Sequence, residues 1–172
     1  MIYDYLIEGE GKNFIFSPFA NFAAFNLDCC SEMMQSPHTL IGLGDGGAHV
    51  GLISDGSFPT TLLAHWGRDR AHGRLDVSWL VKRQTQDNAR AVGLADRGVI
   101  APGYKADLNV IDFDKLAVET PVMKWDLPAG GKRLLQKARG YRATIVSGTV
   151  TYRDGEQTGA LPGKLVRGPQ AA

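Results

Sequence analysis

The sequence predicts an α/β fold that is followed by a smaller β part. Residues 14–19, 27–35 and 39–44 read as strand, helix and strand, and alternating apolar residues appear after about residue 95. A strand–helix–strand order builds a parallel sheet with a right-handed crossover. Asp45 directly follows the second of these strands. Since α/β sheets and barrels place their chemistry at the carboxyl ends of parallel strands, Asp45 is the first candidate site residue.

Start and stop signals define the helices. Glycines close an apolar helix end at residues 1–10, and Asn26 is a suitable N-cap for the helix 27–35, which ends before Pro37. Pro59 opens a helix that runs to about residue 66. Asp76 is the N-cap of the clearest helix, at residues 77–92, which Gly93 terminates.

The second part of the sequence changes its period at about residue 94. Residues 108–113 alternate as a strand does, and residues 143–152 predict a hairpin that turns near Gly148. Between them, residues 114–140 show no strong period and predict a long loop. Residues 153–172 are rich in glycine and proline, and we expect their end to be loosely held.

The stretch around Asp45 contains glycines at positions 44, 46 and 47. Glycine tolerates positive φ and leaves room for a substrate or an ion beside the backbone. The alternative interpretation is a polar turn capped by an aspartate. Further along the chain, His65 is more typical of a core or surface histidine than of a ligand. Residues 67–74 contain several arginines and predict either a solvated loop or a clamp for an anionic group.

Composition excludes several classes of function. The 172 residues carry a formal net charge of +1, and 44% of them are hydrophobic. Because this net charge is small, we expect no nucleic-acid partner. No apolar run approaches the ~20 residues of a membrane span, so we expect no membrane partner either. The N-terminus lacks the pattern of a secretory signal. The adjacent cysteines Cys29 and Cys30 fit neither a disulfide framework nor a metal knuckle, so they predict buried small side chains in a reducing cytoplasm.

Three segments carry a family resemblance. They read GLGDGGAH, TQDNARAVGLADRGVIAPGYKADLNVIDFD and ATIVSGTVTYRDGEQTGALPGKLVR. Together they resemble the C-terminal part of amidohydrolase-superfamily enzymes, in particular the N-acyl-D-amino-acid deacylases (D-aminoacylases) of amidohydrolase family 3. The resemblance implies a C-terminal fragment of a (β/α)8 TIM-type barrel, with its last two or so β/α units, at residues 1–94. It implies part of a small β-sandwich with a tail at residues 95–172.

The resemblance also implies a chemistry. The family's enzymes are zinc-dependent hydrolases of linear amide bonds, here with N-acyl-D-amino acids as the expected small-molecule substrates. Asp45 matches the aspartate that ends the eighth barrel strand, accepts a proton from metal-bound water and passes it to the leaving amine. It would be a metal ligand only together with ligands from the missing part of the barrel. His49 is the candidate residue for touching substrate or orienting Asp45.

The departures from the family pattern matter equally. The sequence has no His-x-His motif, and its four histidines stand at positions 38, 49, 65 and 72. A zinc site needs at least three protein ligands. We therefore expect this chain alone to bind no zinc tightly and to be inactive. Its expected partner is the missing N-terminal part of the barrel, or a second copy of itself. The alternative interpretation is a non-catalytic remnant, an interaction module or a subunit of a split amidohydrolase.

Overall fold

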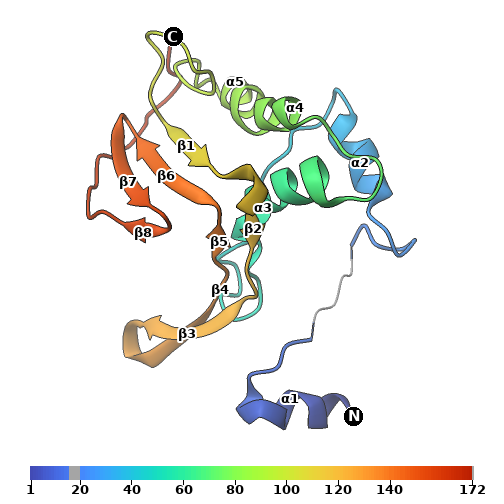
Figure 1. Cartoon of the computed structure of the whole chain (residues 1–172). Helices are drawn as coiled ribbons and strands as arrows, with labels where there is room; N and C mark the ends of the chain where they lie inside the picture. Colours follow the sequence, from blue (N-terminus) through green and yellow to red (C-terminus); the bar gives the residue numbers. More distant parts are fainter. Residues whose placement is uncertain (16–19, 172) are drawn as a thin grey trace. The chain divides into compact units, whose positions relative to one another are not determined.

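The computed structural model describes residues 1–15 and 20–171 of the chain (Figure 1). These residues form two compact units, Met1–Thr39 and Leu40–Ala172. The sequence-based boundary near residue 94, between a barrel part and a β-sandwich part, does not coincide with this division, and it stays a prediction.

The described residues of the first unit form the helices α1 (Ile2–Gly11) and α2 (Asp28–Gln35). Both helices are predicted from the sequence. The last turn of α1 leaves helical geometry from Glu8 to Glu10, and φ is +61° at Gly9. Asn26 acts one residue further from the helix than predicted, because its side-chain oxygen accepts a hydrogen bond from the backbone N–H of Asp28 at 3.0 Å. No residue of α1 or α2 is buried.

The exposure of α2 corrects one prediction. Cys29 is exposed and Cys30 is half-buried, so they are not the buried pair expected from the sequence. The thiol of Cys29 donates to the backbone oxygen of Asn21 at 3.3 Å. The physical reason is that α2 buries no face within its own unit.

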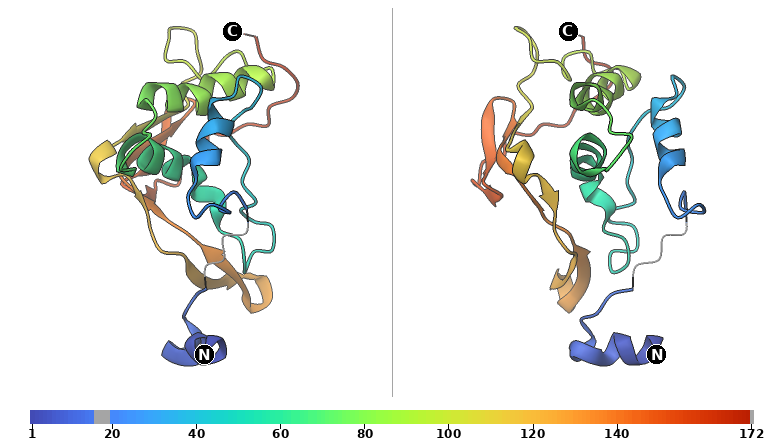
Figure 2. Two further views of the ribbon diagram at one scale, coloured as in Figure 1. Left: turned by 90° about the vertical axis from the view of Figure 1, so that its right-hand side faces the viewer. Right: turned by 45° about the vertical axis from the view of Figure 1, so that its right-hand side comes forward.

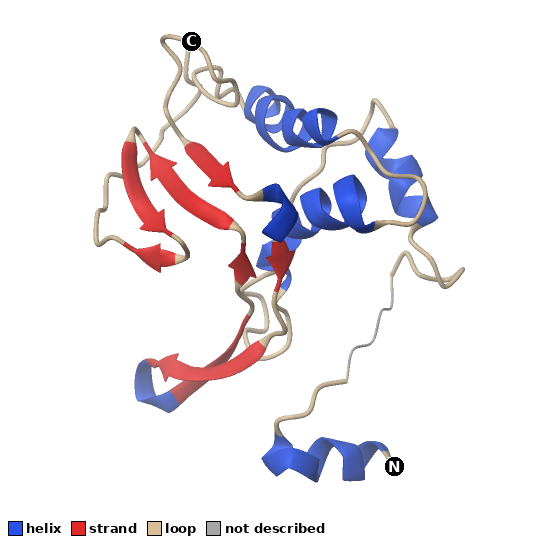
Figure 3. Cartoon of the chain, viewed as in Figure 1, coloured by secondary structure: helices blue, strands red, loops and turns tan. Residues whose placement is uncertain are grey.

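The second unit contains two helical runs, drawn with the other helices in Figure 3. The first consists of η1 (Asp55–Ser57), α3 (Phe58–Thr61) and the π-helical η2 (Leu62–Asp69). The second consists of α4 (Val77–Lys82), the π-helical η3 (Arg83–Asp87) and α5 (Asn88–Ala91). They confirm the helices predicted at residues 59–66 and 77–92.

The ends of the second helical run form as predicted. The carboxylate of Asp76 accepts a hydrogen bond from the backbone N–H of Trp79 at 2.8 Å, which satisfies one of the free amides of the first turn. At the other end Gly93 has φ +76°, and the Leu94 N–H donates to the Ala89 oxygen at 2.8 Å. This arrangement is a Schellman motif, and glycine adopts the required left-handed conformation at little cost.

The strands of the second unit pair antiparallel in three sheets. The largest has the order β1-β6-β7-β8, and the others pair β2 with β5 and β3 with β4. The strands are β1 (Leu108–Ile111), β2 (Ala117–Val118), β3 (Val122–Leu127), β4 (Gly131–Leu135), β5 (Ala138–Arg139), β6 (Tyr141–Val146), β7 (Thr149–Arg153) and β8 (Glu156–Gln157). Short 3-10 turns occupy η4 (Phe113–Lys115) and η5 (Pro128–Gly130).

The predicted strand at residues 108–113 and the predicted hairpin at residues 143–152 are confirmed. The β6–β7 turn contains Ser147 and Gly148, both with positive φ, as a two-residue turn of a twisted hairpin requires. The loop predicted at residues 114–140 is wrong, because this segment forms β2 to β5 and the projecting β3–β4 hairpin (Figure 2). Much of β3 is exposed on both faces, so it carries no alternating apolar pattern to reveal it.

The predicted strand at residues 39–44 is also wrong, and this correction bears on the site. These residues form no strand, and the side chain of Asn88 binds their backbone instead, because its amide donates to the Ile41 oxygen at 2.7 Å. Of the predicted first strand at residues 14–19, Phe14 and Ile15 are not in a strand, and residues 16–19 lie outside the described residues. A parallel strand needs a partner strand to complete its hydrogen bonds. The described residues therefore contain no strand–helix–strand unit.

The core of the second unit lies between the helical runs and the start of the sheets. Leu80 and Leu116 are fully buried. Arg68 links these regions, since its guanidinium donates to the backbone oxygens of Phe113 and, at 2.7 Å, Leu116. The other buried residues are Ile41, Thr60, Leu62, Leu63, Ala64, Trp66 and Ala89. In the described part of the chain, no helix has the length and apolar character that crossing a membrane would require.

Candidate functional site

Asp45 lies in a loop that folds back on itself. Its backbone N–H donates to the Asp55 carboxylate with 2.9 Å between N and Oδ2, and its backbone oxygen accepts from the Ala48 N–H at 2.8 Å. The residue itself is exposed. The backbone at position 45 is therefore held by hydrogen bonds on both sides of the peptide unit, while the residue stays accessible to solvent.

The glycines on either side of Asp45 have a structural purpose. A Cβ atom at Gly46 would lie 2.8 Å from the backbone nitrogen of Gly56, and one at Gly44 would lie 3.0 Å from the Phe58 ring. The room that glycine leaves at positions 44 and 46 is thus taken by the chain's own residues 55–58. At Gly47, where φ is +98°, a Cβ atom would meet nothing within 4 Å, so open space begins there.

His49 lies on the same loop as Asp45. Its φ is +45°, and its backbone oxygen accepts hydrogen bonds from the N–H groups of Leu52 and Ile53 at 2.6 and 3.3 Å. Over the described residues, no hydrogen bond or ion pair joins the His49 side chain to Asp45. The predicted role of His49 in touching substrate or orienting Asp45 stays a prediction.

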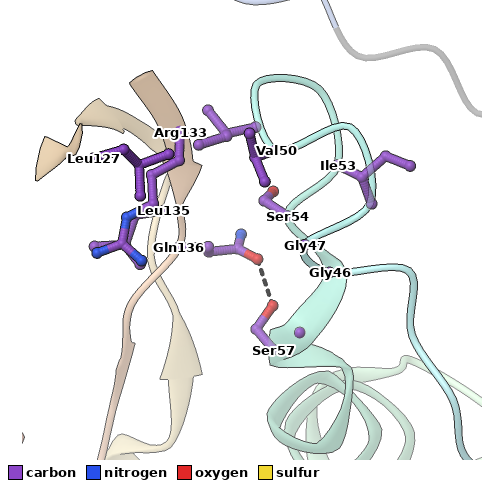
Figure 4. A pocket seen from close by; sticks show the side chains of 12 residues that line it. Gly46, Gly47, Val50, Ile53, Ser54, Ser57, Leu127, Arg133, Leu135 and Gln136 are labelled. Atoms are coloured by element: carbon purple, nitrogen blue, oxygen red, sulfur yellow. Dashed lines mark hydrogen bonds between the residues drawn. The ribbon is translucent and has the colours of Figure 1, made fainter. Parts of the chain in front are cut away.

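The β3–β4 hairpin packs against the loop that follows Asp45. The Leu134 N–H donates to the Val50 oxygen at 2.6 Å, and the side chains of Ser57 and Gln136 are hydrogen-bonded (Figure 4). A cavity of about 300 Å³ lies between the two segments. Its walls contain Gly46, Gly47, Val50, Ile53, Ser54, Gly56 and Ser57 from the loop, and Leu127, Arg133, Leu134, Leu135 and Gln136 from the hairpin region.

Arg133 brings a charge to this cavity, and that charge is paired. Its guanidinium donates two hydrogen bonds to the Asp126 carboxylate, each 2.8 Å long. These bonds hold the pKa of Asp126 below its ordinary value and raise the pKa of Arg133. Bidentate geometry of this kind fixes both side chains on the hairpin.

The residues that the structure describes do not form a complete metal site. Across residues 1–15 and 20–171, no three His, Cys, Asp or Glu side chains are grouped so that they could hold a metal ion. Asp45, His49 and Asp55 share one loop, but a zinc site needs three or more ligands in suitable geometry. The described part of the chain therefore does not by itself fit a bound zinc ion.

The arginines of residues 67–74 contact the protein itself. Arg68 pairs with Asp69 and donates to two backbone oxygens of the η4 region, and the Arg70 guanidinium lies 4.3 Å from the Trp66 ring centroid. His65, on the same helical run, has its pKa lowered from 6.5, first by partial burial and then by the charge of Arg70. These contacts favour a structural role for Arg68 over an anion clamp.

Three residues that shape the site carry no clear signal of this role in the sequence. In the sequence, Asp55 is recognisable only as part of a turn. Asn88 lies on the inner face of the helix predicted at residues 77–92, and Gln136 lies within the predicted loop. Each one acts across a separation in sequence, with Asn88 contacting residue 41 and Gln136 contacting residue 57. The segment Ser54-Asp55-Gly56-Ser57 is the one available signal, because Asp and Ser side chains in turns accept backbone hydrogen bonds.

Several known proteins are similar to parts of this chain. The amidohydrolase family model matches residues 17–152. A 5-methylthioadenosine/S-adenosylhomocysteine deaminase of Desulfitobacterium hafniense (strain DSM 10664 / DCB-2) is 33% identical over 104 residues, which cover 55% of this chain and 24% of the deaminase. Adenine deaminase 1 of Rhizobium meliloti (strain 1021) is 33% identical over 92 residues, which cover 45% of this chain and 16% of that protein.

A solved structure is also similar. The crystal structure of a D-aminoacylase, which defines a novel subset of amidohydrolases, has 29% sequence identity and a TM-score of 0.43. The similarity covers 59% of this chain and 19% of the D-aminoacylase.

The match over residues 17–152 covers more than half of the chain, so this chain belongs to the amidohydrolase family. Membership confirms the resemblance seen in the sequence and implies a fold related to the TIM barrel. The chain spans a quarter or less of the length of the curated relatives it matches.

Proposed function

We propose that this chain is the C-terminal part of a metal-dependent hydrolase that cleaves linear amide bonds, with N-acyl-D-amino acids as its substrates. Membership of the amidohydrolase family supports the reaction class, and the three segments that resemble D-aminoacylases support the substrate class. The single observation that carries the proposal is the exposed carboxylate of Asp45 on a backbone held by Asp55.

In this proposal Asp45 moves the proton. Amide hydrolysis requires a base that takes a proton from the attacking water and an acid that gives a proton to the leaving amine. One carboxylate can do both in turn. The hydrogen bond from the Asp45 N–H to Asp55 holds the backbone, so that the carboxylate stays at one place in the site.

The proposal includes a larger assembly. Apolar residues on both sides of Asp45 are exposed: Leu40 at 54%, Leu43 at 97% and Leu52 at 75%. Large apolar side chains gathered in one exposed segment are typical of a surface that another part of a protein covers. We propose that barrel strands outside these 172 residues, or a second copy of the chain, cover this segment. The zinc ligands that the chain lacks would come from those strands. Residues 1–94 would then belong to the barrel and residues 95–172 to a β-sandwich.

A second candidate reaction is deamination. The two curated relatives are named as deaminases, of 5-methylthioadenosine/S-adenosylhomocysteine and of adenine. Hydrolytic deamination also breaks a C–N bond with water and needs the same proton transfers, so Asp45 would have the same role. The released group, ammonia in one case and an amino acid in the other, distinguishes the two reactions. A non-catalytic interaction module is the remaining alternative.

The test joins these 172 residues to the N-terminal barrel region of a D-aminoacylase in place of that enzyme's own last part. We expect zinc-dependent release of amino acid from N-acetyl-D-amino acids, and a loss of about 100-fold or more in kcat for Asp45→Asn. Asp154→Asn, at the exposed turn between β7 and β8, is the matched control and should keep kcat within about threefold. Release of ammonia from adenine compounds without amide cleavage would favour the deaminase. Full amide cleavage by Asp45→Asn would contradict the assigned role of Asp45.

A further inference from the structure

We propose that the cavity between residues 46–57 and the β3–β4 hairpin is the subsite for the acyl chain of a neutral amide substrate. This inference rests on the proposed amide hydrolysis and adds a substrate preference to it. It assigns a binding role to the hairpin, which has no part in the proton transfer.

The cavity begins beside Asp45. Gly46 and Gly47 form part of its wall and directly follow Asp45. Consecutive Cα atoms lie ~3.8 Å apart, so the cavity begins within one or two residues of the proposed proton carrier. A substrate whose scissile bond lies beside Asp45 can therefore extend its acyl group into this space.

The size of the cavity suits a short chain. Its volume of about 300 Å³ is at the lower end of the range for small-molecule sites. It corresponds to the liquid volume of about ten water molecules. A short aliphatic chain fits such a volume.

The walls of the cavity are largely aliphatic. The cavity is lined by Val50 and Ile53 from the loop and by Leu127, Leu134 and Leu135 from the hairpin side, so both segments supply aliphatic side chains (Figure 4). Two of the polar side chains in the wall, Ser57 and Gln136, are bonded to each other. Burial of a methylene chain between such walls is favourable, since each CH₂ group contributes through its loss of contact with water.

The charge of the cavity is already neutralised. Among the described residues that line it, Arg133 alone is charged, and the Asp126 carboxylate takes two of its hydrogen bonds. An incoming carboxylate would have to compete with Asp126 for the guanidinium. The cavity therefore favours the uncharged acyl end of an N-acyl amino acid over its α-carboxylate.

A backbone contact connects the two walls. The hydrogen bond from Leu134 to Val50, 2.6 Å long, holds the hairpin against the loop. It lies beside the aliphatic side chains named above, so the space between them is fixed by the backbone. A cavity held in this way is formed before the ligand arrives, which lowers the entropic cost of binding.

The experiment measures binding of simple aliphatic amides to the 172-residue chain by backbone amide NMR. Acetamide, butanamide and hexanamide are the probes, and none of them requires catalysis. We expect affinity to increase about fourfold for each added methylene group. The largest chemical-shift changes should occur at Val50, Ile53 and residues 134–136. No binding of hexanamide, affinity that does not depend on chain length, or shift changes elsewhere would overturn the proposal.

A filling substitution and a matched control locate the effect. Val50 is 41% exposed and Val122, on β3, is 46% exposed, and Val122 does not line the cavity. Val50→Phe should weaken hexanamide binding about tenfold or more because the ring occupies the cavity, whereas Val122→Phe should leave it unchanged. Leu135→Ala provides a second test, because a larger cavity should shift the binding preference toward amides with longer chains. Equal weakening by both phenylalanine variants would overturn the proposal.

The subsite and the proposed function can fail separately. If the joined enzyme hydrolyses N-acyl-D-amino acids of every chain length equally and Val50→Phe has no effect, the subsite is wrong and the function stands. If hexanamide binds in the cavity but Asp45→Asn leaves hydrolysis unchanged, the cavity is an apolar site and the role of Asp45 is wrong.

Discussion

The carboxylate of Asp55 accepts the backbone N–H of Asp45, with 2.9 Å between the two atoms. The two aspartates are ten residues apart, and this one bond closes the loop between them. A hydrogen bond from a backbone N–H to an ionised carboxylate is stronger than one to a neutral acceptor. Asp55 is thus a positioning residue for Asp45.

Asp55→Ala should loosen the backbone at Asp45. The N–H of Asp45 loses its acceptor, so we expect its hydrogen exchange to be about tenfold or more faster, measured by NMR on the 172-residue chain. In the joined enzyme, Asp55→Ala should lower kcat although Asp45 itself is unchanged. Asp55→Asn keeps an oxygen acceptor and should restore much of both properties. Slow exchange in Asp55→Ala would show that the bond does not hold the loop.

Asn88→Ala should destabilise the segment that leads to Asp45. The Asn88 amide donates to the Ile41 oxygen at 2.7 Å, and Ile41 belongs to the core. Loss of a partly buried hydrogen bond costs about 1 kcal/mol, or about 2–4 °C in Tm for a chain of this size. Thermal unfolding followed by circular dichroism measures this change.

Asn109→Ala is the matched control for Asn88→Ala. Asn109 bonds Thr144 at an exposed position of the β1–β6 pair, so its loss should change Tm by about 1 °C or less. If the two variants unfold at the same temperature, the Asn88–Ile41 bond contributes no more than a surface contact does.

The parts of the fold that the sequence predicts are those with local signals. Asp76 and Gly93 delimit a helix because a cap and a Schellman turn are made by neighbouring residues. Ser147 and Gly148 specify a hairpin for the same reason. The β3–β4 hairpin has no such signal, since exposure of Lys124 and Trp125 on opposite faces removes the alternation.

The candidate site likewise contains features that the sequence predicts from local signals and features that it does not. Asp45 is a candidate from the sequence because a carboxylate among glycines after an apolar run is a local pattern, and its role stays a prediction. The predicted strand before it fails for a physical reason: apolar residues 39–44 are compatible with a strand, but strand formation depends on a neighbouring strand that the described residues do not provide. The contact of this segment with Asn88 is not predictable, because it depends on how a helix 47 residues away packs.

Gly140→Ala should be strongly destabilising, because two costs combine. Gly140 has φ +95°, which an L-residue adopts at a cost of about 1–2 kcal/mol. A Cβ atom would also lie 2.7 Å from the Cα atom of the fully buried Leu116, adding about 1–3 kcal/mol of overpacking. Gly103→Ala is the control, with φ +88° and nothing within 4 Å of the new atom, so only the backbone cost applies. Chemical denaturation measures both, and equal losses would contradict close packing at Leu116.

His65 should make stability depend on pH above the range in which carboxylates titrate. Partial burial, followed by the charge of Arg70, lowers the pKa of His65 from 6.5, although Asp69 opposes the shift. The unfolded chain therefore binds the proton at a higher pH than the folded chain does. This contribution to stability is fully present above pH ~6.5 and is lost as pH falls through the lower folded pKa. Tm measured from pH 8 to pH 5 should decline below pH ~6.5.

His65→Asn removes the titrating group and should flatten this part of the profile. His72→Asn is the control, because His72 is exposed on the nearby loop and its replacement should preserve the decline. Asparagine also tests the packing separately from the charge: a constant loss of Tm at every pH reports the missing ring, which lies 5.4 Å from the Trp66 ring centroid. A change in Tm that is confined to low pH reports protonation of the His65 side chain. If His65→Asn keeps the full decline, another group is responsible for it, and His65 does not couple protonation to the stability of this helical run.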